Sequence, residues 1–97
     1  MRHSSRSGLW RAMEPDERLT CPACGYKTIP ESHEICYICG WEYDEYQIAH
    51  PDETGANKVS LREAQKYFAA IGAASPSDRG RTPEREHRRD PDWRPLD

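Results

Sequence analysis

The feature that most constrains this chain is a set of four cysteines arranged as two Cys-x-x-Cys pairs. One pair spans residues 21–24 and the other residues 36–39, with eleven residues between them and a glycine after each. Each Cys-x-x-Cys turn supplies two thiolates, and two turns complete a tetrahedral shell with metal–sulfur bonds of about 2.3 Å. The glycines tolerate the positive φ that such turns need. The spacing therefore predicts one metal site, whose ligands are Cys21, Cys24, Cys36 and Cys39.

Two disulfides are the alternative use of four cysteines, and cross-pairing would suit a small secreted domain. However, the arginines of residues 1–18 are followed by no apolar run of signal-peptide length, and no stretch has the length and apolarity of a membrane span. We therefore expect a cytoplasmic location, where paired Cys-x-x-Cys motifs hold metals. Four sulfurs favour zinc first, and a single iron is the alternative.

The composition also favours a fold that is stabilised by a metal. Only 35 % of the 97 residues are hydrophobic and 32 % are charged, whereas globular chains are usually about 45–50 % apolar. A core this poor seldom stabilises a fold alone, so a bound ion is expected to contribute folding free energy. Residues 13–74 hold eleven acidic and five basic side chains. Because the thiolate-bound ion adds further negative charge, this region is expected to repel nucleic acid.

The pattern along the chain predicts a small metal-stabilised α+β fold in three parts. Residues 1–18 are expected to form a flexible basic arm, residues 19–74 the zinc-binding domain and residues 75–97 a charged, proline-rich tail. In the domain, residues 26–29 read as a strand that returns through residues 34–35, which gives a zinc-ribbon-like hairpin carrying both cysteine pairs. Residues 41–46 read as a further strand or an irregular arm.

One C-terminal helix is predicted over residues 60–72. Ser60 and Glu63 have the spacing of a capping box, and Gly72 is placed to end the helix. Apolar residues at helical spacing form the face expected to be buried against the ribbon: Leu61, Ala64, Phe68 and Ile71.

Three aromatic residues in acidic or charged surroundings are candidate contacts for a partner protein. Tyr43 and Tyr46 lie among Glu42, Asp44 and Glu45. Trp93 stands alone in the tail, where it is expected either to pack on the domain or to anchor a partner. Aromatic side chains are enriched in protein interfaces. We therefore expect another protein as partner, rather than a nucleic acid, a membrane or a small-molecule substrate.

The joint pattern resembles the bacterial cysteine-rich CPCC domain family over about residues 19–74. The matching segments are Cys21–Tyr26, Glu34–Cys36, Trp41–Glu42 and Gly55–Ala64. The family's usual Cys-Pro-Cys-Cys is Cys-Pro-Ala-Cys here, with Ala23 in place of the inner cysteine, and the four remaining cysteines still complete one site. The resemblance implies a small zinc-binding domain and brings no established activity with it.

Two other functional classes remain open at this stage. The cysteine pairs also resemble those of rubredoxin-type domains, in which iron transfers single electrons, although the second pair has Tyr37 where that family has proline. A nucleic-acid-binding zinc ribbon would have to use the arginines of the two ends, because the domain itself is acidic. No nucleophile–base pair and no phosphate-binding glycine loop can be recognised, so no catalytic residue is predicted and the chain is not expected to be an enzyme.

Overall fold

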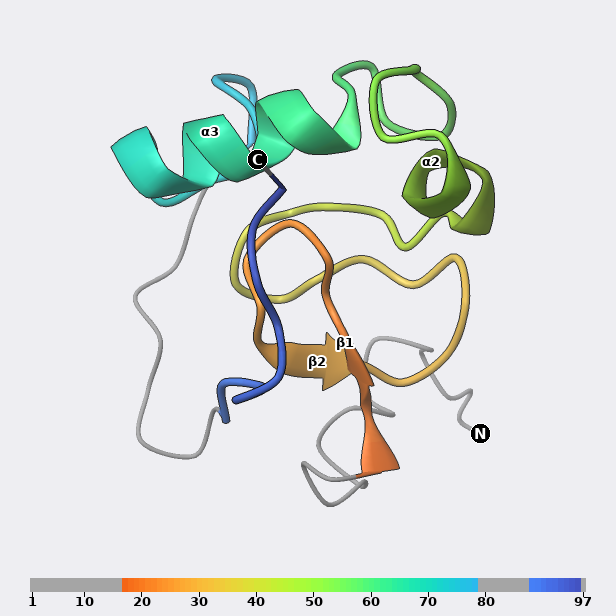
Figure 1. The fold of residues 1–97 in the computed structure, drawn as a ribbon, viewed down its shortest axis with the longest axis vertical. Helices are drawn as coiled ribbons and strands as arrows, with labels where there is room; N and C mark the ends of the chain where they lie inside the picture. Colours follow the sequence, from red (N-terminus) through yellow and green to blue (C-terminus); the bar gives the residue numbers. More distant parts are fainter. Residues whose placement is uncertain (1–16, 79–87, 97) are drawn as a thin grey trace, which may run out of the picture.

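The computed structural model describes residues 17–78 and 88–96 of the chain (Figure 1). The elements in chain order are β1 (Leu19–Thr20), β2 (Lys27–Ile29), α2 (Glu45–Ala49) and α3 (Leu61–Ile71). The two helices lie together on one side of the molecule, and the two-stranded hairpin lies on the other (Figure 1). The predicted small α+β class is therefore confirmed, and the described residues hold one more helix than expected. The predicted flexible arm up to residue 16 and residues 79–87 of the predicted tail lie outside the described residues.

The hairpin forms around the first cysteine pair. Strands β1 and β2 are antiparallel, and Leu19 lies opposite Ile29. The prediction that residues 26–29 return through residues 34–35 was wrong, because Ile35 instead forms an isolated bridge with Glu42 across the second cysteine pair. Each cysteine pair thus lies within its own tight turn, flanked by its own short pairing of backbone segments.

Helix α2 was missed by the sequence interpretation, which placed a strand or irregular arm at residues 41–46. Asp44 is its N-cap, and its carboxylate accepts hydrogen bonds from the backbone N–H groups of Tyr46 at 2.8 Å and Gln47 at 3.4 Å. The second carboxylate oxygen accepts from Ala56 N–H at 2.8 Å. These three donors lower the pKa of Asp44, the Ala56 N–H having the largest effect. Asp44 therefore starts the helix and also holds the loop that follows it.

A buried glutamine fixes the long loop between the two helices. Gln47 is fully buried, and its Nε2 donates to the carbonyl oxygens of Glu53 and Val59. Its Oε1 accepts from the backbone and side-chain N–H groups of Asn57. The Asn57 side chain in turn pairs with the backbone N–H and carbonyl of Glu42. The loop is therefore held by a satisfied polar network, in which every buried amide group has a partner.

Helix α3 agrees closely with the prediction. Ser60 and Glu63 form a complete capping box, and Gly72 ends the helix in the left-handed region with φ 77°. Leu61 and Ala64 are buried, and Phe68 packs partly buried against the core. The prediction for Ile71 was wrong, since its side chain is 55 % exposed. The buried face of α3 therefore ends at Phe68, one turn earlier than its periodicity suggests.

The core consists of the four cysteines and a few large side chains around them. Trp41, Ile29 and Ile38 are fully buried and form one cluster with the cysteines, Leu61 and Ala64. Because the sulfur atoms lie inside this cluster, the candidate metal site and the hydrophobic core are one structure. Among the described residues, no helix has the length and apolarity needed to span a membrane.

Candidate metal site

The two cysteine turns are built alike by their backbones. In the first, Cys21 N–H donates to Tyr26 O at 2.8 Å, and Gly25 N–H donates back to Cys21 O at 2.8 Å. In the second, Cys36 N–H donates to Trp41 O at 2.7 Å and Gly40 N–H to Cys36 O at 3.0 Å. Gly25 and Gly40 have φ values of 85° and 90°, which explains the glycine after each pair. We call these turns, residues 21–26 and 36–41, the first and second knuckle.

The knuckles bring all four sulfur atoms to one point. The Sγ atoms of Cys21 and Cys39 are 3.6 Å apart, and those of Cys24 and Cys36 are 3.7 Å apart. All four lie within 4.8 Å of one another. A tetrahedral shell with bonds of about 2.3 Å places its sulfurs about 3.7–3.8 Å apart. Disulfide bonds of about 2.05 Å are therefore ruled out, and the cysteines are positioned to bind one metal ion as predicted.

The site is closed to solvent. The four cysteines are between 0 and 2 % exposed. The segment after α3 covers both knuckle glycines: a Cβ on Gly25 would lie 2.7 Å from ring carbons of Trp93, and one on Gly40 would lie 2.9 Å from Cγ of Asp78. Each glycine is therefore required twice, once for its backbone conformation and once for the close approach of another segment.

One sulfur receives additional hydrogen bonds. The Thr28 hydroxyl lies 3.0 Å from Cys36 Sγ, and the Ile38 N–H donates to the same sulfur at 3.4 Å. Burial raises the pKa of Cys36, but hydrogen bonds from the other three thiols and from Thr28 outweigh it and lower the pKa overall. Burial, followed by the hydrogen bonds of the other three thiols, raises the pKa of Cys21. A cation at the centre of the four sulfur atoms would stabilise buried thiolates, because metal binding to cysteine releases the thiol proton.

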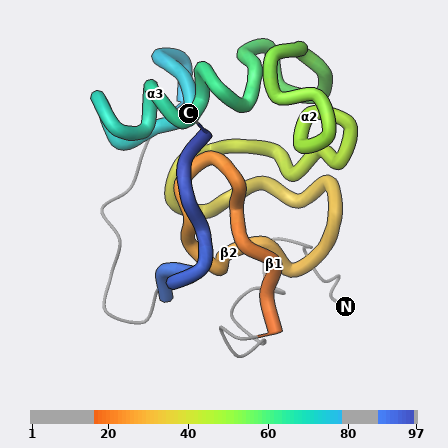
Figure 2. Tube along the Cα trace, viewed as in Figure 1, coloured from red at the N-terminus to blue at the C-terminus, as the bar shows by residue number. Residues whose placement is uncertain are grey.

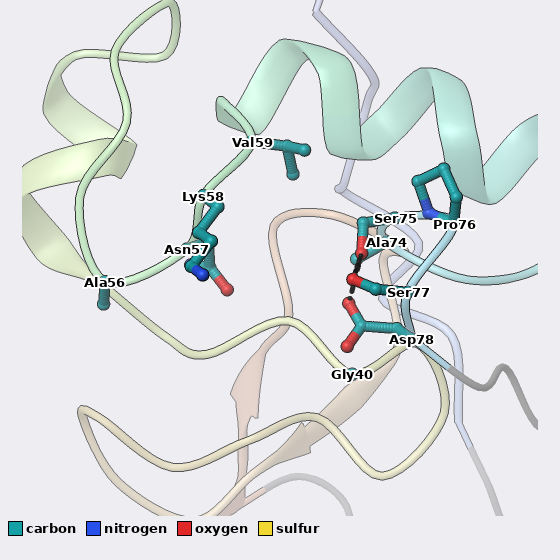
Figure 3. A pocket seen from close by; sticks show the side chains of 10 residues that line it. All are labelled: Gly40, Ala56, Asn57, Lys58, Val59, Ala74, Ser75, Pro76, Ser77 and Asp78. Carbon is teal, nitrogen blue, oxygen red and sulfur yellow. Dashed lines mark hydrogen bonds between the residues drawn. The ribbon is translucent and has the colours of Figure 1, made fainter.

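A small cavity of about 340 Å³ lies beside the second knuckle, between the loop before α3 and the segment after it (Figure 3). Asn57, Lys58 and Val59 line one wall. On the other wall, the Ser75 hydroxyl donates to the Asp78 carboxylate at 3.0 Å. The Ser75–Asp78 bond stabilises the turn of this segment, and Ala74 N–H joins the segment to the second knuckle by donating to Cys39 O at 2.9 Å.

The three predicted partner contacts lie in different surroundings. Tyr46 is 50 % exposed on α2, stacks on His50 and donates its hydroxyl proton to Glu53. Tyr43 is half-buried against the core, and burial raises its pKa. The Trp93 ring packs on the first knuckle, and its Nε1 donates to Pro22 O at 3.0 Å. Trp93 therefore packs on the domain, and Tyr46 is the most accessible of the three.

Sequence reasoning missed Thr28, which contacts a ligand sulfur, and Asp44 and Gln47, which hold the loop. Asp44 precedes a run of helix-forming residues, so its N-cap role was readable in the sequence. The contact of Thr28 with the sulfur had no such signal in the sequence. Threonine is common in strands, so a threonine in a short strand does not indicate a contact with a cysteine.

Comparison with known proteins identifies one family. The family model described as cysteine-rich CPCC matches residues 19–89, well over half of the chain. The comparison with curated proteins returned no match. The matched region contains both knuckles, both helices and the segment that covers the second knuckle. It ends before Trp93, whose ring covers the first knuckle.

Proposed function

This chain is a member of the cysteine-rich CPCC family, and we propose that it is a small zinc-binding accessory module that works by binding another protein. In this proposal the zinc is structural and the chain is not an enzyme. The observation that carries the proposal is the closed set of four buried sulfurs at tetrahedral spacing. A shell filled by four thiolates leaves no position for a metal-bound water, which a hydrolytic zinc site requires.

The zinc would hold together a domain whose core is otherwise small. Its four ligands come from the two knuckles, so the ion would join them through metal–sulfur bonds in addition to their hydrophobic packing. Structural zinc in small domains contributes folding free energy directly, and such domains unfold when the metal is removed. A single iron fits the same four sulfurs, so a red, redox-active protein is the alternative that the metal analysis must exclude.

The surface around α2 is the proposed contact with a partner. Tyr46 and Ile48 are 50 % and 37 % exposed. The exposed acid Glu45 precedes Tyr46 in the chain, and the exposed acid Glu53 accepts a hydrogen bond from the Tyr46 hydroxyl. An aromatic and an aliphatic side chain bordered by carboxylates suit a protein surface that offers an apolar pocket with lysine or arginine at its rim. The acidic charge of residues 13–74 disfavours nucleic acid at the same place.

The experiment is purification of the tagged chain from its native host, followed by metal analysis and identification of co-eluting macromolecules. We expect zinc, and a bound protein that is lost in the Tyr46→Ser/Ile48→Ser double variant. Ile71→Ser is the matched control, because Ile71 is at least as exposed, at 55 %, but lies at the far end of α3. A partner retained by the double variant, or a salt-sensitive nucleic-acid peak in place of a protein, would contradict the proposal.

A further inference from the structure

Residues 88–96, which we call the strap, cross the first knuckle and make a turn at residues 91–92, where Trp93 N–H donates to Asp90 O at 3.1 Å. In Figures 1 and 2 the strap runs as a blue trace past the loop between β1 and β2 and ends beside α3. Its backbone pairs with the knuckle: Lys27 N–H donates to Arg88 O, and Asp90 N–H donates to Gly25 O, both at 2.8 Å. Arg89 and Tyr26 thereby form an antiparallel bridge. This is the geometry in which an extended peptide adds to the edge of a sheet.

Side chains of the strap fill specific positions on the domain. The Trp93 ring lies so close to Gly25 that a Cβ at residue 25 would clash with it, and Trp93 Nε1 donates to Pro22 O. The Arg89 guanidinium lies 5.2 Å from the ring centre of Tyr26 and 5.6 Å from that of Trp93. Such distances are typical of cation–π contacts. An arginine and a tryptophan four residues apart are therefore the anchors of the segment.

The domain supplies a matching set of polar groups from two elements. Thr20 donates to the Asp90 carboxylate at 2.6 Å. From α3, Gln65 donates through Nε2 to Pro22 O at 2.9 Å, and its Oε1 accepts from Leu96 N–H at 2.7 Å. Gln65 thus joins the knuckle to the end of the strap. The contact surface of the strap, formed by Thr20, Pro22, Gly25, Tyr26 and Gln65, lies entirely within the family match at residues 19–89, whereas Asp90, Trp93 and Leu96 lie beyond it.

We propose that this contact surface is a peptide-binding site whose ligand is a segment with an arginine four residues before a tryptophan. The strap is its intramolecular ligand, and a partner protein carrying the same pair competes for the contact surface by displacing the strap. Nine residues, 79–87, connect the strap to the rest of the chain. A tether this short gives an effective concentration of about 1 mM. An affinity of about 10–100 μM for this contact surface would therefore keep the strap bound in about 90–99 % of molecules.

The proposal goes beyond the α2 contact and does not depend on which metal fills the site, because zinc and iron would hold the first knuckle equally. The test uses the full chain with a protease site placed within residues 79–87 and cut after folding with metal. A fluorescent peptide of residues 88–97 is then added, and its binding is followed by anisotropy. We expect saturable binding that unlabelled peptide reverses.

Variant peptides distinguish specific binding of the strap peptide from non-specific binding. Trp93→Ala should weaken peptide binding at least tenfold, because both the ring contact and the bond to Pro22 are lost. Arg94→Ala is the matched control, since the Arg94 guanidinium bonds only to carbonyls of the strap itself, and binding should change less than threefold. Gln65→Ala in the cut protein should also weaken binding. The proposal is overturned if the cut protein unfolds, if no peptide binds at about 1 mM, or if Trp93→Ala binds as well as the natural sequence.

Discussion

Replacing Thr28 by valine should weaken zinc binding more than any other change that leaves the four cysteines and the core volume intact. Thr28 is 1 % exposed, and its hydroxyl lies 3.0 Å from Cys36 Sγ. When Cys36 binds metal as a thiolate, the hydroxyl donates its proton to the sulfur. Valine has nearly the same shape, but it cannot donate, and the burial of this position excludes a replacing water.

The size of the effect follows from the charge on the acceptor. A hydrogen bond to a charged group contributes about 1.5–3 kcal/mol, and each 1.4 kcal/mol corresponds to a factor of ten. The Ile38 N–H, at 3.4 Å, remains as a weaker donor to the same sulfur. We therefore expect a loss of about 10–100-fold in zinc affinity, which is the usual effect of removing a hydrogen-bond partner of a metal ligand.

The assay is competition for zinc against a chromophoric chelator at fixed pH, with thermal unfolding of the zinc form measured in parallel. Thr28→Ser is the matched control, because serine keeps the hydroxyl and loses only a methyl group. The serine variant should retain zinc affinity within about threefold while its Tm falls. If valine retains the full affinity, or if serine and valine lose affinity equally, the hydroxyl–sulfur bond has no part in holding the metal.

Two further variants test the packing and the loop. Phe68→Ala should lower the free energy of unfolding by about 2 kcal/mol, which is less than the 3–5 kcal/mol or so lost at a fully buried phenylalanine. Ile71→Ala should change it by less than about 0.5 kcal/mol, because Ile71 is exposed. Equal losses in chemical denaturation would mean that the buried face of α3 is misassigned. Asp44→Ala should cost about 1–2 kcal/mol at neutral pH, because it removes the N-cap of α2. Since the folded state lowers the pKa of Asp44, its contribution is fully present above the ordinary carboxyl value and is lost only as pH falls through the lower folded value. The difference between Asp44→Ala and the natural protein should thus stay constant from pH 7 to about 5, and a difference that shrinks within this window would refute the anchoring role.

The parts that the sequence predicted well are those in which one local rule decides the structure. The cysteine spacing predicted which four sulfur atoms lie together, because a tetrahedral shell admits few arrangements of two Cys-x-x-Cys turns. The capping box of Ser60 and Glu63 and the terminal glycine at residue 72 defined α3 because they act within a single helical turn.

The parts that the sequence did not predict depend on contacts between distant residues. Tyr26 to Ile29 had strand composition, but composition does not tell which segment pairs with a strand, and the partner was Leu19–Thr20 rather than residues 34–35. Ile71 continues the helical periodicity of the apolar residues, but its side chain is exposed, because the buried face of α3 ends before it. The contact of Trp93 with Gly25 joins residues 68 positions apart, and no local pattern in a charged segment specifies such a contact.

The most direct test of the central claim is the metal content and coordination of the purified protein. Elemental analysis with X-ray absorption should give one zinc per chain, bound by four sulfurs at about 2.3 Å, and chelation of that zinc should unfold the domain. A red protein whose visible absorption bleaches on reduction would replace the structural role with iron electron transfer. Less than about half an equivalent of any metal after metal-replete expression would contradict the four-cysteine site itself.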